Sequence, residues 1–177
     1  MPVSIIPFAM PAPAEIPAHI IDALRQMPPD EAARKTVELL MQIEVAETIV
    51  YERIDREGVI AVRHVAGHRS ADLEATLEKA DGSFASAAAA HNSALLVMGQ
   101  ADADEESALP AGVVGFLLNG AGSGSIGFNY VLPLASEHGQ RVGALTLMRS
   151  AGEGALNHEQ PNICEAMRRE LSAILVG

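Results

Sequence analysis

The chain has 177 residues, a length that predicts one domain with a sizeable core. Hydrophobic residues make up 49% of it and charged residues 20%, which is a globular rather than a disordered composition. The formal net charge of −11 argues against binding to nucleic acid or to an anionic membrane, because both need a positive protein surface.

The single cysteine and the absence of long apolar runs favour a location in the reducing cytoplasm. Cys164 is the only cysteine, so neither an internal disulfide nor a zinc site made of cysteines alone can form. The N-terminal stretch lacks a basic start and is interrupted by prolines, which argues against a signal peptide. No run approaches the ~18 consecutive apolar residues that span a bilayer. We therefore expect a soluble, cytoplasmic protein that does not enter a membrane.

The first residues are predicted to form a proline-rich extension. Residues 1–16 should be an extended arm, because each proline removes an amide donor and restricts the residue before it. Two alternatives remain open: Ile5, Ile6 and Phe8 dock onto the body or onto a second subunit, or the arm is a loosely ordered tail. A short helix is predicted over residues 17–27, ended by two prolines.

A longer helix is predicted from residue 30 to about residue 47, with Asp30 as its N-cap. Its apolar stripe follows helical spacing, and Leu39 and Ile43 lie outside that stripe and widen the apolar surface. One interpretation is burial on two sides within one chain. The other is a homodimer in which this helix and the C-terminal helix pair with their symmetry mates.

A hairpin should follow this helix. Residues 48–54 and 59–65 are rich in strand-forming residues and are separated by a polar break that ends in Gly58. Alternation along the first strand places Ile49, Tyr51 and Arg53 on one face, and Val50 and Ile54 on the other.

The middle of the chain is predicted to mix short helices with apolar runs. Helices are expected over residues 71–80 and over the alanine-dense residues 84–92. Residues 94–98 read as a buried strand. An acidic loop follows, and then a second apolar run, residues 113–118, for which strand and helix both remain open.

The C-terminal third has the clearest pattern. Residues 125–134 and 141–148 are strand-length runs joined by a polar loop that contains Gly139, which predicts a hairpin. Residues 158–175 carry apolar side chains at spacings of three and four, which predicts a closing amphipathic helix.

This C-terminal third resembles the end of a GAF domain, the small-molecule sensing module of many bacterial signalling proteins. The matching segments are YVLPL, a turn that ends in GQR, VGALTL, and LNHEQPNI at the start of the last helix. The resemblance is weaker over residues 30–67 and poor over residues 68–124. It implies an α/β (α+β) fold in which an antiparallel sheet is flanked by helices. Residues 1–29 would then be an N-terminal extension and residues 30–177 the GAF-like domain.

Several motifs that suggest chemistry have simpler structural interpretations. The G-x-G-x-x-G match at residues 122–127 runs into a strand pattern, whereas a dinucleotide site needs a helix end for the phosphates. His64 and His68 follow a strand pattern and lack an obvious third metal ligand. Asn157 and Gln160 fit a helix-capping arrangement. We expect Cys164 to be a small buried residue rather than a nucleophile.

Departures from known GAF subclasses narrow the function that the resemblance implies. The methionine-sulfoxide-reducing members depend on several cysteines, and bilin-binding members attach their chromophore through a cysteine in the middle region, where this chain has none. The Asn-Lys-x-x-Phe signature of cyclic-nucleotide members is absent. Haem or non-haem iron remains open, because His64, His68 or His91 can serve as an iron ligand.

We therefore expect a non-enzymatic sensory or regulatory domain without a catalytic or metal site, whose ligand and cofactor are unknown. Its pocket is predicted to lie between the sheet and residues 84–124, and it would act through a partner or as a homodimer formed by the N- and C-terminal helices. The alternative is a structural dimerisation module with a closed pocket. The candidate ligand-binding residues are polar or aromatic groups able to point into a cavity, namely Tyr51, Arg63, His91, Phe116, Asn129 and Tyr130.

Overall fold

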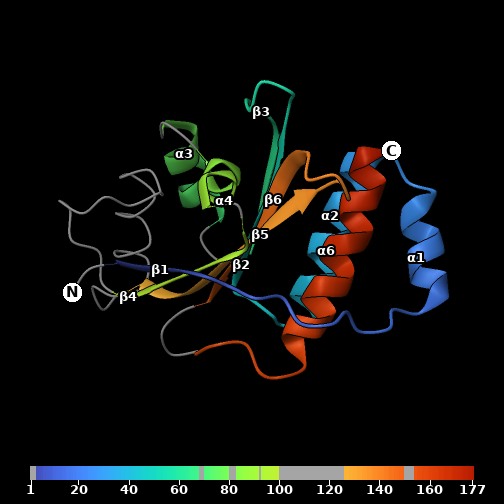
Figure 1. Cartoon of the computed structure of the whole chain (residues 1–177), viewed down its shortest axis with the longest axis horizontal. Helices are drawn as coiled ribbons and strands as arrows, with labels where there is room; N and C mark the ends of the chain where they lie inside the picture. The colour runs from blue at the N-terminus through green and yellow to red at the C-terminus, as the bar shows by residue number, and fades with distance from the viewer. Residues whose placement is uncertain (1–2, 68–69, 80–82, 92, 100–125, 150–153) are drawn as a thin grey trace.

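The computed structural model describes residues 3–67, 70–79, 83–91, 93–99, 126–149 and 154–177. These residues form a six-stranded sheet of strand order β1-β4-β5-β6-β2-β3, in which every neighbouring pair is antiparallel (Figure 1). The strands are β1 (Val3–Pro7), β2 (Thr48–Ile54), β3 (Ile60–Gly67), β4 (Leu95–Gly99), β5 (Ile126–Ala135) and β6 (Arg141–Arg149).

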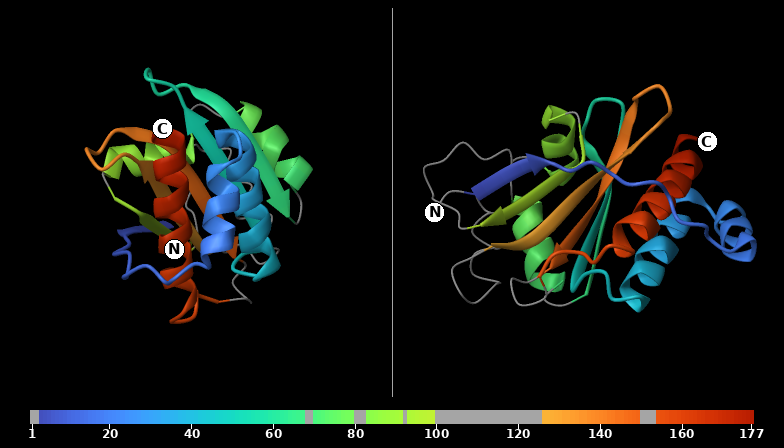
Figure 2. Two further views of the ribbon diagram at one scale, coloured as in Figure 1. Left: turned by 90° about the vertical axis from the view of Figure 1, so that its right-hand side faces the viewer. Right: turned by 60° about the horizontal axis from the view of Figure 1, so that its bottom comes forward.

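Helices lie on both sides of this sheet (Figure 2). One side carries α2 (Pro29–Gln42) and α6 (Gln160–Val176), with α1 (Ala18–Arg25) outside them. The other side carries α3 (Ser70–Lys79) and α4 (Phe84–His91). The predicted fold, an antiparallel sheet flanked by helices with an N-terminal helical extension, is confirmed.

The central strands contribute side chains to both helical layers. In β2, Ile49 and Tyr51 belong to the core beneath α2 and α6, whereas Val50 belongs to the core beneath α3 and α4. In β6, Leu145 and Ala144 divide in the same way. A sheet covered on both faces explains why these strands read as nearly continuous apolar runs.

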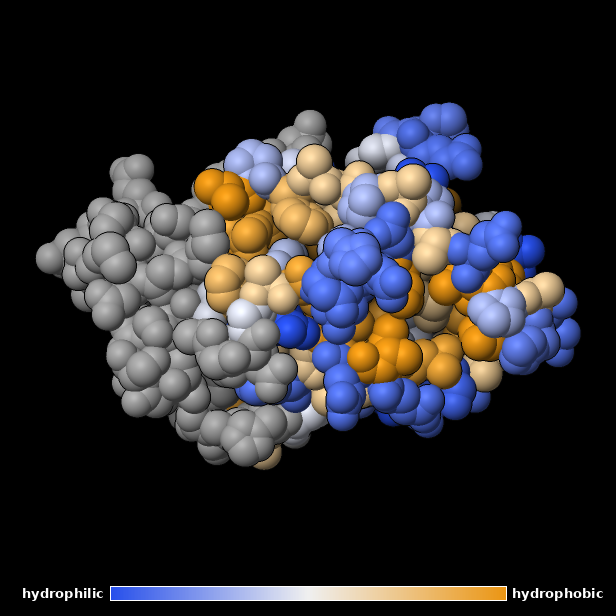
Figure 3. Space-filling model, turned by 90° about the horizontal axis from the view of Figure 1, so that it is seen from below, coloured by the Kyte–Doolittle hydropathy of each residue, from blue (hydrophilic) through white to orange (hydrophobic). Residues whose placement is uncertain are grey.

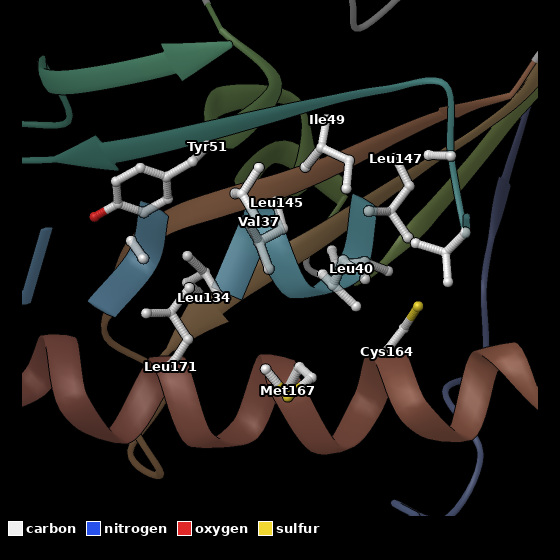
Figure 4. Close-up of a cluster of buried hydrophobic side chains, with 14 of the residues drawn as sticks. Val37, Leu40, Ile49, Tyr51, Leu134, Leu145, Leu147, Cys164, Met167 and Leu171 are labelled. Carbon is white, nitrogen blue, oxygen red and sulfur yellow. The ribbon is translucent and has the colours of Figure 1, made fainter. Parts of the chain in front are cut away.

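The first core fills the space between the sheet, α2 and α6 (Figure 4). Leucines of β5 and β6 point toward Leu40 of α2 and toward Met167 and Leu171 of α6, and each of these three helix residues is at most 4% exposed. Packing of this kind stabilises the domain mainly by removing apolar surface from water, at ~25 cal/mol per Å².

The expected hydrogen bonds between Asn157 and Gln160 are present at the start of the last helix, but the N-cap itself is Glu159, which carries no side-chain cap. The Asn157 amide donates to Gln160 Oε1 at 2.9 Å, and the Gln160 amide donates to Asn157 Oδ1 at 2.9 Å. This reciprocal pair satisfies amides that the first helical turn leaves without partners. Pro161 fits the first turn because that position needs no amide donor.

The prediction for the start of α2 is wrong in detail. Pro28 is the N-cap and Asp30 lies inside the first turn, with no side-chain cap at this end. The helix also ends at Gln42 instead of near residue 47, because Glu44 adopts a left-handed conformation with φ 58° and turns the chain.

The N-terminal arm is docked rather than loose. Its residues 3–7 form β1, which pairs with β4 at the edge of the sheet. Other predictions in the middle of the chain are confirmed for α3, α4 and β4. The run at residues 113–118 and the glycines at positions 122 and 124 lie outside the described residues.

Gly143 marks the closest approach between β6 and β2. A Cβ atom at this position would overlap the Glu52 carbonyl of the neighbouring strand. This close approach explains why the first residue of the Gly-Ala-Leu-Thr-Leu segment is a glycine.

We expect Gly143→Ala to lower the free energy of unfolding by about 3 kcal/mol, because the two backbones must separate. Gly58→Ala is the control: it has open space but a φ of 82°, so it should cost about 1 kcal/mol. Urea denaturation measures both. Equal losses for the two variants would contradict the overlap at Gly143.

Candidate functional site

The face of the sheet beneath α3 and α4 is the candidate functional site. Val50, Val131 and Val97 lie on this face and pack with Phe84 and Ala88 of α4. Within this apolar surface the strands also place a small number of buried polar groups, which is the usual composition of a small-molecule site.

Glu52, together with Thr146, is one of the two most deeply buried of these polar groups. Its side chain is 1% exposed, and its Oε1 accepts a hydrogen bond from the Ala85 amide in the first turn of α4 at 3.0 Å. Arg63 of β3 donates to Oε2 through Nε at 3.1 Å and through Nη2 at 3.0 Å. Glu52 thereby connects the start of α4 to the sheet and is itself neutralised by Arg63.

Burial still dominates the electrostatics of this carboxylate. It raises the pKa of Glu52 above its ordinary value, although the Ala85 amide and the Arg63 guanidinium act in the opposite direction. The ion pair therefore holds α4 in place, but the desolvation of Glu52 reduces its contribution to stability.

Thr146 places on this face a buried hydroxyl without a hydrogen-bond partner among the described residues. It lies on β6 between Val50 of β2 and Val131 of β5, and its side chain is fully buried. Its hydroxyl oxygen has no hydrogen-bond partner within the described part of the chain, and the same holds for Ser93 just before β4. A buried hydroxyl without a partner costs roughly 1–3 kcal/mol, so such a group is uncommon unless something else binds it.

Asn129 adds an amide to the same face. It alternates with Phe128 and Tyr130 along β5 and is 3% exposed. Its Nδ2 donates to the Val97 carbonyl of β4 at 3.3 Å. Asn129 thus lies where β5 and β4 meet, on the side of the sheet that carries α4.

The six candidate residues do not form one group. Arg63 and Asn129 lie on the face beneath α3 and α4, and Tyr51 and Tyr130 lie on the opposite face beneath α2 and α6. His91 ends α4, and its side chain lies outside the described residues, as does the whole of Phe116.

Tyr51 instead belongs to a contact that fixes the start of α2. Its hydroxyl donates to Asp30 Oδ1 at 3.0 Å, and Arg53 donates to both oxygens of Asp30 at 2.9 and 3.1 Å. The hydrogen bonds from Arg53 are the main reason why the pKa of Asp30 lies below its ordinary value. Burial and the hydrogen bond to Asp30 raise the pKa of Tyr51.

Tyr130 is likewise engaged within the protein. Its ring meets the ring of Phe8 edge-on, with centroids 5.1 Å apart, and its hydroxyl accepts a hydrogen bond from the Leu156 amide at 3.1 Å. The residue is 2% exposed. Both tyrosines therefore hold elements onto the sheet.

Sequence reasoning missed Glu52 and Thr146. A charged residue in a strand pattern is usually solvent-exposed, so Glu52 gave no signal of burial. The alternation of Thr146 with Leu145 and Leu147 places it on the other face from these leucines, but it does not show that a helix covers that face.

The other potentially reactive or metal-binding side chains form no candidate site within the described residues. No group of three or more histidine, cysteine or acidic side chains could hold a metal ion there. Cys164 is 1% exposed, and burial raises its pKa to about 12, so the thiol is unreactive. Among the same residues, no helix is both long and apolar enough to cross a membrane.

A surface hollow of about 540 Å³ lies between the β5–β6 turn and the last turns of α6. Arg168 and Arg169 line it, but both donate to the buried carboxylate of Glu165, and Arg168 also donates to the Pro133 carbonyl at 3.1 Å. Both arginines therefore already have a carboxylate partner within α6, and Arg168 also holds α6 against β5.

Comparison with known proteins agrees with the fold and leaves the ligand open. No protein-family model and no curated protein matches the chain. The crystal structure of a GAF domain/HD domain protein from Geobacter sulfurreducens is similar, with a TM-score of 0.63 and 13% sequence identity. The match covers 85% of this chain and 94% of that one. The chain therefore has a GAF-like fold.

We expect Arg63→Met to cost about 3–5 kcal/mol, because it leaves the Glu52 carboxylate buried without its cation. The loss should grow as the pH rises. Burial raises the pKa of Glu52 and Arg63 lowers it, so removal of Arg63 raises the folded-state pKa further above the unfolded value. The variant therefore keeps losing stability with rising pH over a range in which the parent no longer does. Urea denaturation at pH 5 and pH 8 measures both effects.

Arg56→Met, in the exposed β2–β3 turn, is the matched control and should have little effect on stability. The double variant Glu52→Leu/Arg63→Met should recover part of the loss, because no charge then stays buried. A loss below about 1 kcal/mol for Arg63→Met that does not depend on pH would contradict the assignment.

We expect Asp30→Asn to cost about 1 kcal/mol at pH 7, a value that is discounted because the Asp30 side chain is 38% exposed. Because the pKa of Asp30 is lowered in the folded protein, the Asp30 charge contributes its full stabilisation at pH values above the unfolded-state pKa of about 3.9. The stabilisation is lost as the pH falls through the folded-state pKa. The difference between variant and parent in thermal unfolding should therefore shrink below pH 4. A constant difference from pH 7 to pH 3 would rule out a role for the Asp30 charge.

Proposed function

We propose that this protein is a non-enzymatic sensory or regulatory domain that binds a small molecule on the sheet face beneath α3 and α4. The observation that carries the proposal is the buried, unpartnered hydroxyl of Thr146 on that face. The GAF-like fold supports it, because such domains generally sense small molecules. Signalling would then proceed through a partner or through a homodimer that involves the N- and C-terminal helices.

The charges on this face favour a neutral ligand. Within the described residues, Glu52 and Arg63 neutralise each other, and the buried side chains of Thr146, Asn129 and Thr48 on this face are uncharged. The surrounding side chains are apolar, mostly valines, leucines and alanines together with Phe84 and Met148. A largely apolar molecule with one or two hydrogen-bonding groups matches this composition, because it would satisfy Thr146 without burying a new charge.

A structural dimerisation module with a closed pocket is the second candidate. It is supported by Phe84, Leu73 and Leu77, which are at most 1% exposed and fill part of the space between the sheet, α3 and α4. In that case the exposed Ile43, just after α2, and the partly buried Leu39 of α2 would pair with a second copy.

Thermal unfolding of the parent protein and of Thr146→Val tests the proposal. Without ligand, Thr146→Val should raise stability by about 1 kcal/mol, because it removes a buried unsatisfied hydroxyl. Against a panel of neutral metabolites, the parent should show stabilisation that increases with ligand concentration, and the variant should show less.

Ser136→Val is the control, because Ser136 lies in the β5–β6 turn, away from this face. It should leave ligand-dependent stabilisation unchanged. The ligand site would be disproved if Thr146→Val and the parent responded equally to every stabilising compound. Concentration-dependent dimerisation without stabilisation by any compound would favour the structural module.

A further inference from the structure

The first described residues of the chain run across one whole side of the molecule. Residues 3–27, which we call the N-terminal strap, begin as β1 on the edge of the sheet, pass the start of α6, and end as α1 against α2 and α6 (Figures 1 and 2). The strap leads directly into α2 through Pro28 and Pro29.

Besides the pairing of β1 with β4, polar contacts anchor the strap at three separate places. The Phe8 amide donates to the Ala94 carbonyl at 2.8 Å, beside β4. Asn162, near the start of α6, accepts from the Ala14 amide at 2.9 Å and donates through its side chain to the Ala12 carbonyl at 2.8 Å. At the far end, Arg25 donates to Glu170 at 2.5 and 3.2 Å.

The apolar anchoring of the strap is thin. Of its described side chains, only Leu24 is fully buried in the first core. Five others pack against that core while staying partly exposed, namely Phe8, Met10, Ile16, Ile20 and Met27. Seen from below, the described surface alternates between hydrophobic and hydrophilic patches (Figure 3). The strap is therefore held by few apolar contacts compared with α2 and α6.

The helix within the strap is also weak by itself. α1 has eight residues, no side-chain N-cap and no acidic residue in its first turn. An isolated helix of this length is unstable in water, and its N-terminal amides lack the usual compensation. The Arg25 side chain is 61% exposed, so its ion pair with Glu170 is also weak.

We propose that the strap releases and docks as one unit while the rest of the domain stays folded. Release uncovers Tyr130, whose ring packs on Phe8, and the parts of α2 and α6 that α1 covers. The strap is thus a built-in cover over Tyr130 and over parts of α2 and α6, and beyond β1 it lies on the other side of the sheet from α3 and α4. Segments held by few buried contacts open well below the free energy of global unfolding.

Native-state hydrogen exchange of the full chain tests this proposal. The amides of Phe8, Ala14, Ile20 and Met27 are each hydrogen-bonded and report along the length of the strap. They should share one opening equilibrium, and the amides of β2 and β6 should exchange far more slowly.

Reversing the charge at one anchor should change the amide exchange rates along the whole strap. Arg25→Glu is expected to accelerate exchange at all four amides by about fivefold, the equivalent of an exposed ion pair, without changing β2 or β6. Glu170→Arg in the same chain should restore the parent rates by reversing the pair. Lys35→Glu, which reverses an exposed pair with Glu38 on α2, is the matched control and should leave the strap unchanged.

Asn162→Ala tests the proposal from a second anchor and should accelerate exchange at Met27 as well as at Ala14. The proposal is overturned if Arg25→Glu accelerates only the α1 amides and leaves Phe8 and Ala14 at the parent rate. It is also overturned if the strap amides exchange only through global unfolding, at the rates of β2 and β6.

Discussion

Burial of the strands β2, β6 and β5 on both faces is the constraint on which the rest of the structure depends. Each of these strands must supply side chains to two separate cores, one beneath α2 and α6 and one beneath α3 and α4. Polar groups in the strands are then buried wherever alternation places them beneath a helix. Glu52 and Thr146 are such groups. Glu52 is hydrogen-bonded to other parts of the protein and so makes a structural contact. Thr146 has no hydrogen-bond partner in the described residues and so marks the candidate site.

Glu52 is fully accounted for within the protein. Arg63 and the start of α4 supply its hydrogen bonds, so its role is to fix α4 on the sheet at some cost in desolvation. Thr146, on the neighbouring strand, has no such partner in the described residues. The same face thus combines a rigidly held helix with an unsatisfied hydrogen-bonding group, which is the pre-organisation that small-molecule sites generally have.

The sequence was informative wherever local signals decide the structure. The β5–β6 hairpin, the last helix and the Asn157–Gln160 hydrogen bonds were predicted because their signals lie within a few residues of one another. Asp30 was misplaced because its partners, Tyr51 and Arg53, are on another element, and long-range partners leave no local pattern. β1 was missed for the same reason, since only its pairing with β4 makes it a strand. Alternation separates Asn129 from Tyr130, but it does not show which face carries α4.

A crystal structure of the protein purified from cells without refolding tests the central claim most directly. Electron density for a small molecule is expected on the face beneath α3 and α4, within hydrogen-bond distance of Thr146 Oγ1. Density that shows only apolar side chains, or only a water molecule, around this hydroxyl would contradict a ligand site on this face.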